Sequence, residues 1–161
     1  MPARSVAATV LVGTLALSLT ACAPAAGPTF DAVRAQSEEA VTEVVAAMPT
    51  GSTYTASGDP TSTPCGTGSA TVDGPRGTAF ATIQGQVTLP GAADAASIIA
   101  DLPTALGDGW AVEPVGIDVD LATVRLNRAG SGVSVDITEL AADAPVALDI
   151  LAVSSCGRVE R

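Results

Sequence analysis

The stretch "VRLNRAGSGVSVDIT", residues 124–138, carries the clearest structural signal in the chain. Apolar and polar residues alternate on both sides of a central Ala129-Gly-Ser-Gly132 segment, with Val124 and Leu126 leading into it. Strict alternation over four to eight residues is typical of a β-strand with one buried face. A short glycine-containing link between two such runs predicts a β-hairpin. This stretch therefore indicates an antiparallel sheet with one apolar and one polar face.

The same alternation continues upstream of the hairpin. Residues 115–121 place Asp118 and Asp120 on the polar side, and Trp110 begins an earlier strand directly after Gly107-Asp-Gly109. These segments extend the predicted sheet by two further strands.

Two more distant segments complete the predicted sheet. Residues 79–89 alternate and are preceded by a short run, residues 70–72, and a turn at residues 73–77. After Pro145, the segment "VALDILAVSSCG", residues 146–157, has apolar residues on both faces, which predicts a central rather than an edge strand.

Two segments have helical periodicity instead. Residues 31–48 repeat apolar residues every three or four positions, and Pro49 ends the run. Residues 92–106 predict a second helix, in which Pro103 should produce a kink or a break near Asp101 because proline lacks the N–H that a helix needs.

The order of these elements predicts an α+β fold: an antiparallel sheet of about five to six strands with two helices packed on one face. Residues 49–69, rich in Thr, Ser, Gly and Pro, predict a long loop with at most a short strand around Tyr54. Cys65 is positioned to tether this loop.

The N-terminus has the layout of an export signal. One positive charge precedes an uncharged apolar run that is shorter than the roughly 20 residues a membrane-spanning helix requires. Leu19-Thr20-Ala21-Cys22 resembles the lipobox of bacterial lipoproteins, which implies cleavage before Cys22 and acylation of its thiol. An ordinary signal peptide is the alternative. The expected domains are a signal peptide (1–21), an acylated cysteine with a flexible tether (22–29) and one α+β domain (30–161).

Composition narrows the possible partners. Without residues 1–21, the chain has 17 acidic residues against six arginines, with no lysine or histidine, a net charge of −11. This charge opposes nucleic-acid phosphates and anionic headgroups. We therefore expect no nucleic-acid partner, and we expect attachment to the outer face of the cell membrane through acyl chains on Cys22.

Cys65 and Cys156 remain after Cys22 is acylated, and an even pair in an oxidising compartment predicts a disulfide. Free thiols are the alternative. Two thiols without histidine or a CxxC motif make a metal site or a catalytic cysteine a poor interpretation. We expect no metal and no cofactor.

Two further groups could carry function. Asp118 and Asp120 could serve a carboxylate-dependent hydrolase acting on cell-wall glycan, although Arg125 and Arg128 on the next strand favour a solvated ion-pair surface instead. Tyr54 and Trp110 could line a shallow apolar pocket between the second helix and the sheet, or simply fill the core.

The acylated cysteine, the Cys65/Cys156 pair and Gly109-Trp110 together resemble small actinobacterial envelope lipoproteins of the mycobacterial LppA-like kind. The resemblance implies a lipid-anchored, outward-facing protein and supplies no catalytic residues. We expect a non-catalytic protein that binds an envelope partner or a small ligand.

Overall fold

The computed structural model describes residues 27–66, 72–91, 93–114, 121–140 and 145–160. In chain order its elements are α1 (Phe30–Ala46), β1 (Thr53–Ala56), β2 (Thr61–Pro64), β3 (Thr78–Thr88), α2 (Ala95–Leu106), a 3-10 turn η1 (Gly107–Gly109), β4 (Trp110–Glu113), β5 (Thr123–Arg128), β6 (Val133–Leu140), β7 (Ala147–Val153) and β8 (Gly157–Arg158).

The strands form one sheet in the order β1-β3-β7-β6-β5-β4, and every described strand pair is antiparallel. The registers place β1 and β2 one after the other along one edge of β3, and β7 and β8 along its other edge. The predicted α+β class is confirmed. Within the described residues the sheet has eight strands rather than five to six, because β1 and β2 share one edge of β3 and the two-residue β8 follows β7 along the other edge.

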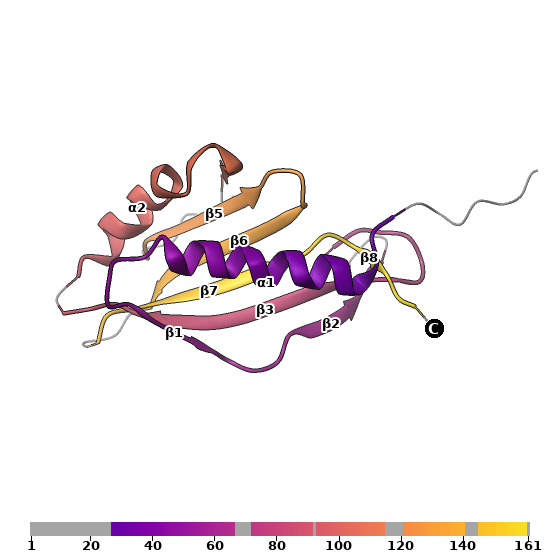
Figure 1. Cartoon of the computed structure of the whole chain (residues 1–161), viewed down its shortest axis with the longest axis horizontal. Helices are drawn as coiled ribbons and strands as arrows, with labels where there is room; N and C mark the ends of the chain where they lie inside the picture. The colour runs from indigo at the N-terminus through magenta and orange to yellow at the C-terminus, as the bar shows by residue number, and fades with distance from the viewer. Residues whose placement is uncertain (1–26, 67–71, 92, 115–120, 141–144, 161) are drawn as a thin grey trace, which may run out of the picture.

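Both helices cover the same face of the sheet (Figure 1). The core between the layers joins apolar residues of α1 and α2 to the inward-facing residues of the strands. The fully buried large side chains of this core include Val44, Leu102, Leu126, Ile137, Leu148 and Ile150. The last predicted strand is central as expected, because β7 lies between β3 and β6.

The opposite face of the sheet is largely polar, and its side chains bond across strands. Arg125 donates to both carboxylate oxygens of Asp136, with Nε–Oδ1 and Nη2–Oδ2 distances of 2.6 and 2.8 Å. The hydroxyls of Thr123 and Thr138 lie 2.9 Å apart. Such cross-strand pairs each stabilise a sheet modestly.

Two expectations about where regular secondary structure is interrupted need correction. The short strand expected around Tyr54 is present as β1, but the rest of residues 49–66 is not one long loop, because β2 also pairs with β3. Residues 67–69 lie outside the described residues. The break expected near Asp101 is absent, and α2 continues through Pro103. Ile99 and Leu102 are both buried, so core packing offsets the hydrogen bond that Pro103 cannot donate. Val72 lies in a bend, and residues 70 and 71 lie outside the described residues.

Part of the expected tether is held against the domain. The backbone N–H of Arg158 donates to the carbonyl of Pro28, and its guanidinium donates to the carbonyl of Gly27. Thr29 pairs with Arg158 as an isolated parallel bridge and caps α1 by accepting a bond from the N–H of Ala32. Residues 27–29 are therefore bonded to β8.

Candidate functional site

An apolar hollow of about 360 Å³ opens between α2 and the β4–β5 edge of the sheet. None of the described residues that line it is charged. The lining residues are Ala96, Ile99, Ala100, Pro103, Val112, Ala122, Thr123 and Val124. Val112 is 56% exposed, although its strand neighbour Leu126 is fully buried. At the hollow, part of the helix-covered face of the sheet is thus exposed to solvent.

The sequence of α2 explains why the hollow is open. Ala96, Ala100 and Pro103 follow one another at helical spacing and present small side chains toward the groove. β4 is the last described strand at this edge of the sheet, so within the described residues no further strand covers Val112 from the side. The side chain of Asp94 fixes the start of α2 by accepting bonds from the N–H groups of Ala96 and Ser97. Hydrogen bonds from Ser97 lower the pKa of Asp94 below its ordinary value.

Trp110 lies beside this region but joins α1 to the sheet. Its Nε1–H donates to Glu43 across 3.2 Å. Arg128 binds the same carboxylate, with an Nη2–Oε1 distance of 2.5 Å, and also binds Glu39, with an Nη1–Oε2 distance of 2.9 Å. Hydrogen bonding to Glu39, and then to Glu43, raises the pKa of Arg128. This polar group fastens α1 to β4 and β5.

Tyr54 lies at the far side of the sheet from Trp110. It belongs to β1, and Trp110 belongs to β4, so the two residues occupy opposite edges. Its ring covers Gly85 of β3 and packs against the core. Burial, with a smaller contribution from Asp149, raises the pKa of its phenol. The structure therefore does not bring Tyr54 and Trp110 into one pocket.

The hollow occupies the place where a pocket was expected, between the second helix and the sheet, but other residues line it. Sequence reasoning selected the scarce aromatic residues and overlooked the small ones. The helical spacing of Ala96, Ala100 and Pro103 is the signal that could have located the groove. Its depth also depends on which strand is the edge, and that follows from topology.

The remaining predicted site residues have different outcomes. Cys65 and Cys156 form the predicted disulfide, with a Cα–Cα distance of 6.3 Å. Cys22, Asp118 and Asp120 lie outside the described residues.

Within the described residues, the two arginines expected as cross-strand partners of those aspartates each bind another carboxylate. Arg125 binds Asp136 on the polar face of the sheet, whereas Arg128 binds α1 on the helix-covered face. Hydrogen bonding to Asp136 raises the pKa of Arg125.

Within the described ranges, no three His, Cys, Asp or Glu side chains are grouped as a metal site. None of the helices in those ranges combines the length and apolar character needed to cross a membrane.

Comparison with known proteins gives no relative: no protein-family model, curated protein or solved structure matches this chain.

Proposed function

We propose that this chain is an exported, non-catalytic lipoprotein that is held on the outer face of the cell membrane by acyl chains on Cys22 and binds a small, uncharged, apolar molecule. The lipobox-like Leu19-Thr20-Ala21-Cys22 segment supports the anchor. The Cys65–Cys156 disulfide supports export, because disulfides persist mainly in oxidising compartments.

The observation that carries the binding proposal is the apolar hollow beside α2. Its volume falls within the roughly 300–1,000 Å³ of typical small-molecule sites. An ionic ligand would lose hydration there without gaining a charged partner among the described lining residues, none of which is charged. An apolar ligand that covered Val112 and its apolar neighbours would instead gain binding free energy. The gain is about 25 cal/mol per Å² of apolar surface removed from water. The preferred ligand is therefore apolar.

Binding can be tested with the neutral fluorescent probe N-phenyl-1-naphthylamine and the chain from Ala23 onward, which lacks the acylated cysteine. We expect saturable fluorescence enhancement, and we expect Val112→Asp to weaken binding at least tenfold by placing a charge in the hollow. Val159→Asp is the matched control, because Val159 is 50% exposed, directly follows β8 and does not line the hollow. Equal effects of the two variants would disprove this site.

The anchor is tested separately by Cys22→Ala in the full chain. We expect this variant to leave the membrane fraction or to remain unprocessed, because the thiol that receives the lipid is gone. Fractionation and labelling with a palmitate analogue measure the result. Wild-type processing and membrane retention of the variant would contradict the anchor without affecting the hollow.

A further inference from the structure

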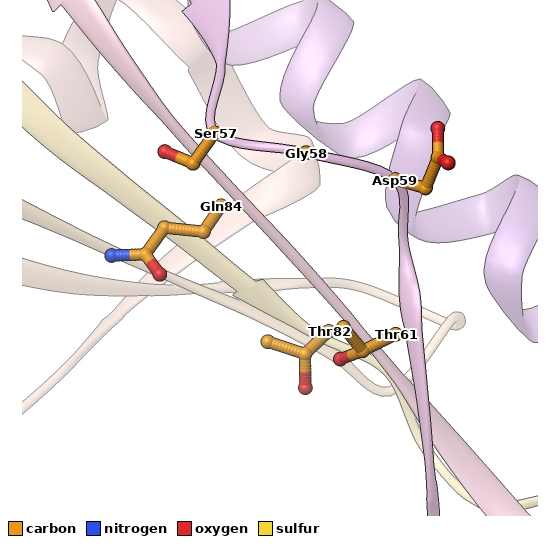
Figure 2. A pocket seen from close by; sticks show the side chains of 6 residues that line it. All are labelled: Ser57, Gly58, Asp59, Thr61, Thr82 and Gln84. Carbon is orange, nitrogen blue, oxygen red and sulfur yellow. The ribbon is translucent and has the colours of Figure 1, made fainter.

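A second hollow, of about 230 Å³, lies on the polar face of the sheet where β1 gives way to β2 (Figure 2). Ala56 pairs with Gly85 and Thr61 pairs with Thr82, so four residues, 57–60, face only two residues of β3. The two extra residues bend this edge away from β3, as in a β-bulge. Bulges of this kind occur at sheet edges and often re-aim side chains for function.

The hollow is lined by hydroxyl and amide groups. Ser57, Gly58 and Asp59 come from the bulge, Thr61 from β2, and Thr82 and Gln84 from β3. Thr61 and Thr82 are register partners, so their side chains lie next to each other on one face. Figure 2 shows the carboxylate of Asp59 turned away from the other side chains. The hollow therefore has one carboxylate among its lining residues, and the other side chains that line it are neutral.

The orientation of Gln84 is fixed by a neighbour. Its Nε2 donates to both carboxylate oxygens of Asp149, at 3.2 and 3.3 Å. A carboxylate only accepts hydrogen bonds, so the amide nitrogen must face Asp149. The amide oxygen then points to the side of Thr82 (Figure 2). The hollow consequently contains one oriented acceptor beside hydroxyls that can either donate or accept.

From this arrangement we infer that the bulge between β1 and β2 is a binding site for a neutral sugar ring. Neighbouring sugar hydroxyls each donate and accept, which matches one fixed acceptor next to hydroxyls that can rotate to do either. The volume admits a single ring. None of the described lining residues is aromatic, so they offer a ring no stacking surface and its affinity rests on hydrogen bonds. The site is separate from the apolar hollow, with which it shares no residue.

The chain offers a specific spectroscopic test. It has only four side-chain amides, those of Gln36, Gln84, Gln86 and Asn127. The acylated chain, which begins at Cys22, is kept in micelles of a detergent without sugar. It is titrated with neutral hexasaccharides of glucose, galactose, mannose and arabinose, and amide NMR signals are recorded. We expect a saturable shift of the Gln84 side-chain amide with at least one sugar and little change at Gln86, two residues along the same strand face.

Matched variants separate the site from the rest of the face. Thr82→Val should weaken binding about fivefold or more, which is the loss of about one hydrogen bond. Thr88→Val, on the same face of β3 but outside the hollow, should change nothing. A second, independent pair of variants is Gln84→Ala, inside the hollow, and its control Gln86→Ala, outside it. The proposal is overturned by the absence of a saturable shift with all four sugars, by equal effects of paired variants, or by a Gln84 response to calcium chloride or phosphate instead of sugar.

Discussion

Gly85 lies in the middle of β3, directly beneath the ring of Tyr54. A Cβ atom at this position would come within 2.5 to 2.6 Å of three atoms of that ring, closer than real Cβ atoms approach. The missing side chain therefore allows the one tyrosine of the chain to lie on the strand and close the β1 side of the core. Glycine weakens a strand interior, and an aromatic ring from the neighbouring strand compensates for it.

We predict that Gly85→Ala destabilises the fold by about 1–3 kcal/mol, because the ring must move out of its packed position. Combining it with Tyr54→Ala should cost less than the sum of the two single changes, since the clash is then gone. Urea unfolding of the four proteins in the cycle measures this coupling. Gly109→Ala, where a Cβ meets nothing within 4 Å, should stay within about 0.5 kcal/mol of wild type. Additive single effects would show that the ring is not held on Gly85.

The partner of a single residue could be predicted from the sequence where its chemistry allowed few alternatives. Cys65 and Cys156 were the only cysteines left to pair, and they do so. The partners of Trp110 and Tyr54 were not predictable. Glu43 meets Trp110 across 67 residues, and Gly85 meets Tyr54 only because β1 pairs with β3 in one particular register. These contacts depend on tertiary placement, which no local pattern encodes.

Helices and strands whose apolar residues recur at a regular spacing were predicted well, and the short edge strands were not. The helices α1 and α2, the β5–β6 hairpin and central β7 follow the predicted boundaries within a few residues, because their apolar residues face one core. Most residues of β1 and β2 are exposed on both faces, so their sequences lack the alternation of apolar and polar residues that predicts a strand. Their backbone bonds to β3 define them. The sugar-sized hollow depends on the interruption between them and was missed for the same reason.

The helix α2 carries a pH-dependent cap. Hydrogen bonds lower the pKa of Asp94 below its ordinary value of 3.8 in the folded chain. A lowered folded pKa means that the cap stabilises above pH 3.8 and that this stabilisation is lost as the pH falls through the folded value. Asp94→Asn keeps a capping side chain without this titration.

We therefore predict that the unfolding free energy falls less between pH 5 and pH 2 in Asp94→Asn than in wild type. Urea unfolding at several pH values measures the two slopes. Asp101→Asn provides a control, because Asp101 is exposed in the same helix and is not its cap. Identical acid sensitivity of Asp94→Asn and wild type would exclude the cap as its source.

At the scale of the whole molecule, the start of α1, β8 and the disulfide all lie at one end of the sheet. Figure 1 shows the start of α1, β8 and the last described residues of the chain together there. The disulfide is at this end too, because Cys65 follows β2 and Cys156 precedes β8, on either side of β3. A Cβ on Gly74 would meet Cys156 Sγ, so this glycine packs directly against the bridge. If Cys22 carries the anchor, it is only five residues from Gly27, or at most about 18 Å of chain. The membrane would then lie close to the bridged end.

The disulfide closes a sequence separation of 91 residues, for which the chain-entropy model gives about 4–5 kcal/mol. This is comparable to the whole stability of a marginal domain, and measured values are often smaller. The bridge joins β2 to the chain beside β8, and β2 is otherwise a four-residue edge strand whose four residues are all exposed. β1, by contrast, also has Tyr54 packed on the core. The two parts of this edge should therefore respond differently to reduction.

We predict that reduction lowers the melting temperature markedly and frees β2 and β8 before β1. Limited proteolysis under reducing conditions should cut first between residues 57 and 66 or after Cys156, while residues 53–56 stay protected by their pairing with β3. Mass spectrometry of the fragments identifies the cuts. The Cys65→Ser/Cys156→Ser double variant should resemble the reduced protein and gain no further sensitivity from reductant. Unchanged melting and cleavage after complete reduction would mean that the strand pairing holds this end without the bridge.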